Sequence, residues 1–261
     1  MLILLPPSEG KHAPARGKPL DLDTLTFPEL RGARAAVLDE LVRRCRDEPD
    51  TMLHVLGLST GQAGQVQRDA GLRHAPTARA DRVYTGVLYD ALGLTDLEAA
   101  ARRRATRWLL VTSALFGVVG PADRIPAYRL SGGVRLPDLG SLAQHWSRHL
   151  HAPLADAAGT GLVVDLRSSA YSAFWRPAKA AAEQVATVRV LHEQEGRRSV
   201  VSHFNKATKG RIVRALLVDG GSPRSPDELA EHLAGLGWHV EPQRARPGAA
   251  RQLDVVVTAL G

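Results

Sequence analysis

The segment that most constrains the fold of this chain runs from residue 108 to residue 135. It opens with a short apolar run, residues 108–112, whose length and β-branched content are typical of a strand covered on both faces. The run then breaks into glycines, a proline and polar residues. Such a loop directly after a buried strand predicts a functional loop. The alternative is a long, well-ordered structural connection.

Two other apolar runs end in a similar way. Residues 2–5 lead into a polar loop at residues 6–11, and residues 162–166 carry Asp165 at their carboxyl end. In open α/β sheets, ligands bind outside the carboxyl ends of the strands. We therefore expect an α/β protein in which the loops 6–11, 113–129 and 202–209 form one composite site.

The Gly10-Lys11 pair in the first loop resembles only part of a phosphate-binding loop. The earlier glycine and the following Ser or Thr of a Walker motif are missing, and Pro6 and Pro7 supply no backbone N–H groups. A Walker motif is therefore excluded, and Lys11 is predicted to contact an anion through its side chain.

The remaining elements are predicted from periodicity and turn residues. Helices are expected at residues 28–46, 97–107, 141–150, 205–218 and 227–236. Antiparallel strands are expected at residues 185–193 and 199–204, and a last strand at 253–258. Residues 82–89 predict either a strand with a bulge or a loop that a ligand approaches closely. The weak linker at 220–225 lies too near the end to divide the chain, so residues 1–261 are expected to form a single domain with a mixed β-sheet flanked by helices.

Charge and cysteine content narrow the functional classes. The net charge of +7 comes mainly from arginine, and it favours a nucleic-acid or nucleotide partner only slightly. Cys45 is the only cysteine, which excludes an intramolecular disulfide and a cysteine-based zinc site. No run approaches the roughly 18 apolar residues that would span a bilayer, and the first residues lack the features of a signal peptide. We expect a cytoplasmic protein without a membrane partner.

The helix expected after residue 204 carries two lysines near its apolar stripe. On a helical wheel, Lys206 and Lys209 project within about 50° of the stripe's centre, whereas Arg211 and Arg214 point away from it and are expected to be solvated. Either the lysines reach the surface along the stripe, or the helix begins at a cleft, with Asn205 as its cap, and helps to bind an anion.

A metal site is not expected. His145 and His149 have the i, i+4 spacing of metal ligands on a helix, but no HExxH pattern is present and acidic residues are few nearby. The sequence therefore predicts neither a metal nor a cofactor.

Five segments together resemble the YaaA family of peroxide-stress proteins. They are PPSEGK at residues 6–11, VYTG at 83–86, SALFGVVGPADRIPAYRL at 113–130, VVDLRSSAY at 163–171 and SHFNKATKGRIVRAL at 202–216. The resemblance follows the order of the family motifs and covers nearly the whole chain. It implies a single α/β domain of unusual fold, protection during hydrogen peroxide stress and a link to the control of free intracellular iron.

The resemblance also implies binding of duplex and branched DNA through a basic cleft and a helix-hairpin-helix-like element. The candidate hairpin is residues 117–120, whose Gly117 and Gly120 would let backbone N–H groups approach a phosphate. Lys206 and Lys209 fall on basic family positions, and Tyr128 and Arg129 match the family's Tyr-Arg pair.

The chain departs from the family pattern at two places. Its first loop reads Pro-Pro-Ser-Glu-Gly-Lys where Ser-Pro-Ala-Lys is familiar, so Lys11 need not replace the family lysine. Asp165 stands where an Asn is familiar, and Ser169-Ala170 where an Asp-Glu pair is familiar. A change in acidic groups at a strand end can alter the ligand.

Three functions follow from these residues. The first is a DNA-binding stress protein that limits iron-driven damage, with Lys11, Gly117, Gly120, Tyr128, Arg129, Lys206 and Lys209 as contacts. The second is an enzyme acting on a nucleotide, a nucleobase or another small anion, with Glu9, Asp123 or Asp165 as acid or base. The third treats the polar loops as structural and the stress function as indirect. Cys45 is a poor peroxide sensor because it lies in an expected helix without a resolving thiol.

Overall fold

The computed structural model describes residues 1–258 and contains one large mixed sheet. The order of its main path is β11-β12-β9-β8-β1-β3-β4, and β10 pairs with the outer part of β9. Its strands are β1 (Leu2–Leu5), β3 (Leu109–Ser113), β4 (Gly117–Val119), β8 (Val163–Asp165), β9 (Val185–Gln194), β10 (Arg197–Ser199), β11 (His239–Pro242) and β12 (Arg251–Val257). Two small two-stranded sheets are formed by β2 (Ala78–Arg79) with β5 (Arg124–Ile125), and by β6 (Arg135–Leu136) with β7 (Gly140–Ser141).

The centre of the large sheet is parallel and largely apolar, with polar residues only at the carboxyl ends of β3 and β8. β1 pairs in parallel with β3 on one side and with β8 on the other, and β9 and β12 continue the parallel arrangement. Ile3, Leu4 and Leu5 are 0% exposed. Strands buried on both faces must be apolar along their whole length, which is why these runs could be recognised in the sequence. The antiparallel strands β4, β10 and β11 make the sheet mixed, as predicted.

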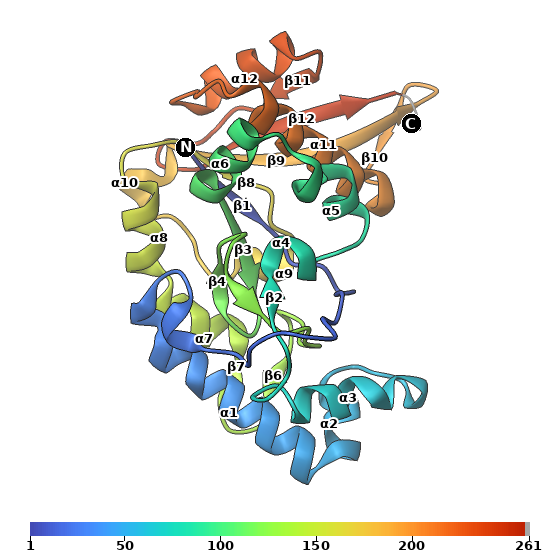
Figure 1. Ribbon diagram of the computed structural model, residues 1–261. Coiled ribbons are helices and arrows are strands. Elements are labelled where there is room, and N and C mark those ends of the chain that lie inside the picture. The colour runs from blue at the N-terminus through green and yellow to red at the C-terminus, as the bar shows by residue number, and fades with distance from the viewer. Residues whose placement is uncertain (259–261) are drawn as a thin grey trace.

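Helices surround this sheet. The α-helices are α1 (Arg31–Asp47), α2 (Pro49–Val55), α3 (Ala63–Ala70), α4 (Ala80–Val83), α5 (Val87–Leu92), α6 (Ala99–Trp108), α7 (Leu142–His149), α8 (His151–Ala158), α9 (Ser169–Ser172), α10 (Lys179–Ala182), α11 (Ser202–Asp219) and α12 (Pro226–Gly235). Short 3₁₀ helices occur at Leu22–Thr24, Pro28–Leu30, Thr60–Gln62 and Leu94–Asp96. The first three α-helices lie together at the end of the molecule opposite α12 and β11 (Figure 1). No helix in the described part of the chain is long and apolar enough to cross a membrane.

The order of the strands places a topological switch at β1. The chain passes from β1 to its neighbour β3, and later returns to β8 on the opposite side of β1. In open α/β sheets such a reversal opens a crevice at the carboxyl ends of the strands. The loops after β1, β3 and β8 therefore meet at one edge of the sheet.

The structure excludes one of the two alternatives for residues 82–89 and corrects the expected strand at residues 199–204. Residues 82–89 do not form a strand, because α4 and α5 flank a short turn at Tyr84 to Gly86. The second strand of the predicted hairpin is β10, and residues 202–204 already belong to α11. Asn205 is consequently not a cap: its backbone N–H donates to the Val201 carbonyl within the first turn of the helix. Alternating β-branched residues marked both segments as extended, but packing against neighbouring elements outweighs this propensity.

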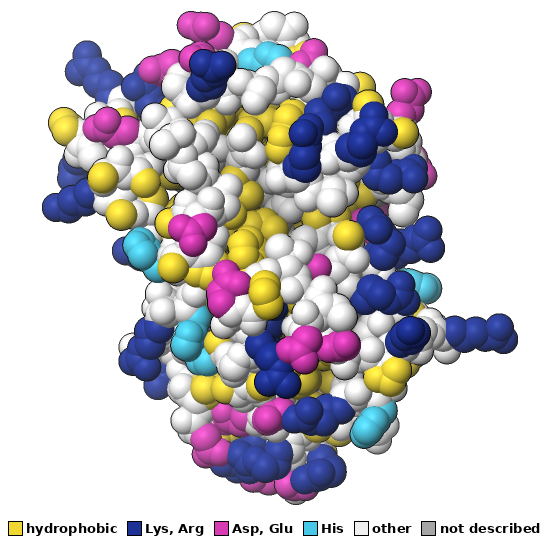
Figure 2. All heavy atoms as spheres, turned by 60° about the vertical axis from the view of Figure 1, so that its left-hand side comes forward, with side chains coloured by type: hydrophobic (Ala, Val, Ile, Leu, Met, Phe, Trp, Pro, Cys, Tyr) yellow, Lys and Arg dark blue, Asp and Glu magenta, His cyan; other side chains and the backbone are white. Residues whose placement is uncertain are grey.

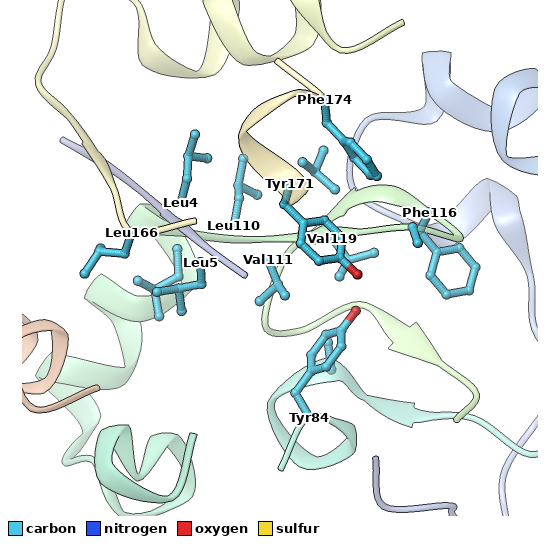
Figure 3. Packing of buried hydrophobic residues seen from close by; sticks show 14 of the residues in the cluster. Leu4, Leu5, Tyr84, Leu110, Val111, Phe116, Val119, Leu166, Tyr171 and Phe174 are labelled. Carbon is cyan, nitrogen blue, oxygen red and sulfur yellow. The ribbon is translucent and has the colours of Figure 1, made fainter. Parts of the chain in front are cut away.

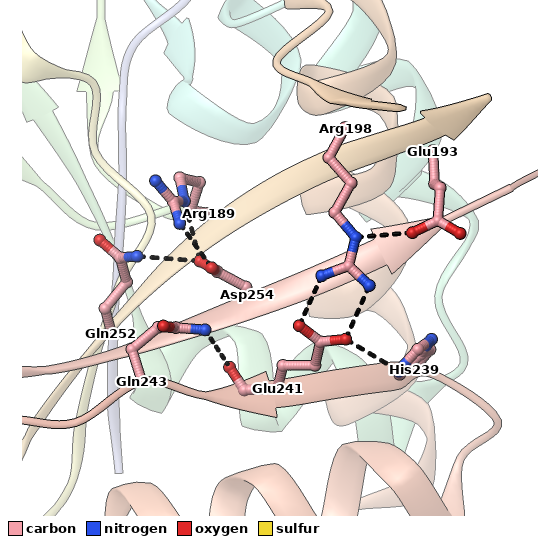
Figure 4. Close-up of polar contacts among 8 residues, drawn as sticks. All are labelled: Arg189, Glu193, Arg198, His239, Glu241, Gln243, Gln252 and Asp254. Atoms are coloured by element: carbon pink, nitrogen blue, oxygen red, sulfur yellow. Dashed lines mark hydrogen bonds and ion pairs between the residues drawn. The ribbon is translucent and has the colours of Figure 1, made fainter. Parts of the chain in front are cut away.

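The C-terminal part of the sheet is joined by side-chain ion pairs (Figure 4). Arg198 of β10 donates to Glu193 of β9 at 2.6 Å and to both carboxylate oxygens of Glu241 on β11 at 2.7 and 2.9 Å. On the neighbouring strands, Arg189 forms a bidentate pair with the buried Asp254 at 2.8 and 2.5 Å. These contacts tie the hairpin β9–β10 to the edge strand β11.

Candidate functional site at the carboxyl ends of the central strands

The loops that follow β1, β3 and β8 are fixed to one another by backbone and hydroxyl hydrogen bonds. The Thr112 hydroxyl at the end of β3 donates to the Leu5 carbonyl at 2.8 Å, and the Leu166 N–H donates to the Leu4 carbonyl at 2.9 Å. The three strand ends thus form one floor, as the switch in strand order requires.

The loop at residues 6–11 is held against the turn between α4 and α5. The Tyr89 hydroxyl donates to the Pro6 carbonyl at 2.6 Å, and the Thr85 N–H donates to the Ser8 hydroxyl oxygen at 3.1 Å. Lys11 forms an isolated antiparallel bridge with Tyr84. Residues 82–89 thus shape the loop that carries Lys11, which agrees with the second interpretation of this segment as a loop near the site.

The Lys11 side chain is half-buried, and its ammonium group lies against aromatic rings and carbonyl oxygens. Its Nζ lies 4.2 Å from the centre of the Tyr128 ring and 5.7 Å from that of Tyr84, and it donates to the Ser8 carbonyl at 2.7 Å. Burial, and next to it the charge of Arg129, lower the pKa of Lys11 to about 7. At neutral pH a large share of this amine is therefore uncharged, which is unusual for lysine.

Two of the four tyrosines of the chain, Tyr84 and Tyr128, lie against this amine. The Tyr128 hydroxyl lies 3.1 Å from that of Tyr84 and 2.7 Å from the Ser113 hydroxyl, and the Tyr171 hydroxyl accepts the Gly132 N–H at 3.1 Å. Figure 3 shows the hydroxyl groups of Tyr84 and Tyr171 pointing toward one another. Burial raises the pKa of Tyr84 and Tyr128 well above its usual range, so the hydroxyls stay protonated and can donate hydrogen bonds.

Asp69 is a buried carboxyl group that the sequence analysis missed. It lies in α3 with 0% exposure, and its Oδ1 accepts the Arg129 N–H at 2.9 Å. Its Oδ2 is buried and has no hydrogen-bond partner among the described residues. Burial raises the pKa of Asp69 to about 7, against the opposing effects of the Arg129 N–H and the Lys11 charge. The only sequence signal was its position three residues after the buried Val66, on the same face of the helix.

Arg129 and Glu9 lie at the solvent side of the site. The Arg129 guanidinium is 3.6 Å from the Glu9 carboxylate, whose side chain is 83% exposed. An exposed pair at this distance is weak. A bound anion could therefore replace Glu9 as the partner of Arg129.

Beside this group, Asp165 and Lys209 form internal contacts. Asp165 is paired with the buried Arg167 through two hydrogen bonds of 2.9 and 2.7 Å. Lys209 donates to the Leu166 carbonyl at 3.1 Å, and burial lowers the pKa of Lys209 while Asp165 raises it. Both Asp165 and Lys209 thus have partners that hold the end of β8 against α11.

The comparison with known proteins agrees with the residue pattern. The sequence profile of the family described as peroxide stress protein YaaA matches residues 1–244. The chain belongs to this YaaA family. A UPF0246 protein of Streptomyces coelicolor is 54% identical over 98% of both chains, and one of Corynebacterium efficiens is 40% identical over 94% of this chain and 97% of its own. An uncharacterized protein of Campylobacter jejuni is 26% identical over 82% of this chain and 83% of its own.

Several residues of the YaaA motifs make internal contacts. Gly117 starts the buried strand β4, and the Gly120 N–H donates to Asp123 at 2.9 Å. Asp123 also accepts the backbone N–H and the hydroxyl of Thr26, at 3.0 and 2.9 Å. Gly120 and Asp123 thus organise the loop through internal hydrogen bonds, and the phosphate contact of the two glycines and the acid-base role of Asp123 stay predictions. The helix-hairpin-helix-like element stays a prediction.

The two lysines of the YaaA helix α11 do not lie together. Lys209 faces inward, whereas Lys206 is exposed. Arg214, expected to be solvated, donates to the Leu92 and Gly93 carbonyls at 3.0 Å each, while Arg211 is exposed. Helical periodicity gives the side of the helix on which a residue lies. It does not show which turns of the helix are covered by neighbouring segments, and this decides whether a side chain on that side is buried or exposed.

The remaining expectations concern thiols and metals. Cys45 is 2% exposed, and burial raises the pKa of its thiol to about 12, in agreement with the prediction that it is a poor peroxide sensor. The His145 Nε2 lies 3.1 Å from the Ala33 carbonyl, and its ring is 4.9 Å from that of His149. Among the side chains that the structure describes, which do not include those of residues 202 and 203, no three His, Cys, Asp or Glu residues are grouped so that they could hold a metal ion.

Proposed function

We propose that this YaaA-family protein acts in peroxide stress by binding a small anionic ligand at the carboxyl ends of β1, β3 and β8. The observation that carries the proposal is the half-buried Lys11 amine, which lies against the Tyr128 ring and feels the charge of Asp69, whose buried Oδ2 has no hydrogen-bond partner among the described residues. A carboxylate with a purely structural role would have hydrogen-bond partners on both oxygens, because an unpaired buried polar atom costs free energy. The pKa of the Lys11 amine and that of the Asp69 carboxyl group are both shifted toward 7. Such strongly shifted pKa values are typical of ligand and active sites.

The burial of the residues predicted to contact a ligand also favours a small ligand over duplex DNA at the carboxyl ends of these strands. Tyr128 is 2% exposed, and Gly117 and Gly120 are buried. Phosphates of a duplex are contacted by side chains and N–H groups that reach the protein surface.

Binding can be tested by thermal unfolding with a panel of small anions, such as pyrophosphate, nucleotides and oxalate. A ligand at a concentration of 100 times its Kd should stabilise the native state by about 2.7 kcal/mol. The stabilisation should disappear in Arg129→Met and persist in Lys179→Met, which removes an exposed cation elsewhere. Equal stabilisation of both variants by every anion would refute the site.

DNA binding is the second function that we propose, and it is supported by a different observation. The chain carries a net charge of +7, and Arg103, Arg104 and Arg107 line a surface hollow of about 470 Å³ on α6. Lysine and arginine side chains are spread over the upper and lower parts of the face in Figure 2, with acidic residues among them. The limitation of iron-driven damage, implied by the family resemblance, belongs to this second proposal.

The two proposals differ in their dependence on salt. DNA affinity should fall steeply with salt, with a slope of about 0.9 per neutralised phosphate on a logarithmic scale. We expect Arg103→Ala/Arg107→Ala and Lys206→Ala to lower the slope by about one for each phosphate that the variant no longer neutralises. Unchanged slopes would assign DNA binding to another surface. In cells that lack the gene, an unaltered level of free iron under peroxide would contradict the iron function.

A further inference from the structure

The Lys11 amine has the surroundings of a nucleophile as well as those of an anion contact. One side of the Nζ is covered by the Tyr128 ring at 4.2 Å, and the Ser8 carbonyl accepts from it at 2.7 Å. Lysine becomes nucleophilic at neutral pH when it is desolvated or lies next to another cation. Both conditions are met here, because burial and the Arg129 charge are the two largest causes that lower its pKa.

The groups around the amine are suited to the addition of a carbonyl compound. The Tyr84 and Ser113 hydroxyls join that of Tyr128 in one hydrogen-bonded set at 3.1 and 2.7 Å, and protonated hydroxyls can donate to a carbonyl oxygen. Asp69 offers a buried carboxyl oxygen without a partner in the described part of the chain. With a pKa of about 7, Asp69 can both give and take a proton at neutral pH.

We propose that Lys11 forms a reversible imine with a small anionic carbonyl compound, an aldehyde or a 2-oxo acid, whose carboxylate pairs with Arg129. This inference deepens the proposed ligand site and rests on it. The nitrogen lone pair attacks the carbonyl carbon and a C–N bond forms. The carbonyl oxygen then leaves as water with the two hydrogens of the amine, and C=N replaces C=O. Nothing is oxidised or reduced, and Asp69 transfers the protons.

The chain provides internal controls for a test of this chemistry. It has five lysines, and Lys18, Lys179 and Lys206 are exposed. At pH 7 about half of an amine with a pKa near 7 is uncharged, against roughly one in 2,500 for an ordinary lysine. Even after allowance for its lower basicity, Lys11 should react at least about tenfold faster than the exposed lysines.

The experiment uses glyoxylate, an anionic aldehyde, with cyanoborohydride at pH 7 and mapping of the modified peptides by mass spectrometry. We expect a carboxymethyl group on Lys11 well before the exposed lysines are labelled, and none at residue 11 in Lys11→Arg, which keeps a cation. Labelling of Lys11 no faster than of Lys18 would overturn the proposal. Stabilisation by oxalate without an adduct from glyoxylate would leave the ligand site intact and exclude the imine.

Two variants separate the contributions of Arg129 and Asp69. The ratio of labelling rates for glyoxylate and a neutral aldehyde should fall in Arg129→Met, because only the anion loses its partner; an unchanged ratio would remove Arg129 from the proposal. Asp69→Asn keeps an acceptor for the Arg129 N–H but removes the charge that raises the Lys11 pKa. Half-maximal labelling should therefore move to lower pH, and a purely structural role of Asp69 would leave the midpoint unchanged. Arg129, Glu9, Asp69, Tyr84 and Tyr128 are the titratable groups shown to act on or lie against the amine.

Discussion

Replacing Lys11 by Met should change how the free energy of unfolding depends on pH. The folded-state pKa of Lys11 is about 7, below the ordinary value near 10.4, so the unfolded chain binds more protons between these values. The contribution of Lys11 to stability therefore rises with pH through this window and is lost as the pH falls toward 7, while Asp69, with its raised pKa, acts in the opposite direction near pH 7 in both wild type and variant. Between pH 6 and pH 9 the difference amounts to about 3 kcal/mol, with one pKa unit corresponding to about 1.4 kcal/mol. Lys11→Met removes this contribution.

The assay is urea unfolding of wild type, Lys11→Met and the control Lys18→Met at several values between pH 6 and pH 9. Lys18 is exposed, so its replacement should shift all points equally. The free energy of unfolding of Lys11→Met, taken relative to that of wild type, should be about 3 kcal/mol higher at pH 6 than at pH 9. Parallel curves for all three proteins would mean that the Lys11 amine is as solvated as an ordinary lysine, and the reasoning about the site would fail.

Three further predictions concern the surroundings of the site. Arg34 is 0% exposed and donates to four backbone carbonyls, two of them on residues 116 and 118. Arg34→Met should therefore lower the free energy of unfolding in urea by at least about 3 kcal/mol. A loss below about 1 kcal/mol would contradict the idea that these hydrogen bonds hold the loop in place. Gly117→Ala places a Cβ 2.7 Å from the Trp146 ring at φ 72° and should cost about 2–4 kcal/mol, whereas Gly133→Ala meets no atom within 4 Å and should be nearly neutral. Cys45→Ser should keep full peroxide resistance in cells if the protein folds, because the buried thiol is not reactive; loss of resistance at unchanged protein level would show a required thiol.

Much of the fold could be predicted from the sequence because its signals are local. A strand buried on both faces is apolar along its whole length, so β1, β3 and β8 were visible as runs bounded by polar loops. The long helices α1 and α11 were visible through their 3.6-residue period, within a few residues of their ends. Short elements such as β4 carry too few residues for a period to be seen, and residues 82–89 show that β-branched composition yields to tertiary packing.

The site was only partly predictable. Lys11, Tyr128 and Arg129 were chosen from the loops that follow β1 and β3, and the structure brings them together. Asp69 lies in a segment without a strand end or a motif, and Tyr84 lies in the VYTG motif, which does not mark it as a polar contact. Their positions depend on how α3 and the turn after α4 pack over the sheet.

The sequence by itself determined the family, the apolar strands, and which loops lie at their carboxyl ends, since these follow from residue order and periodicity. Only the tertiary structure decided which side chains gather at the carboxyl ends of the central strands. Gly117 and Gly120 became buried, Lys206 remained in solvent, and Lys11 acquired a pKa of about 7. Desolvation depends on every group packed around an atom, and those groups come from segments far apart in the chain.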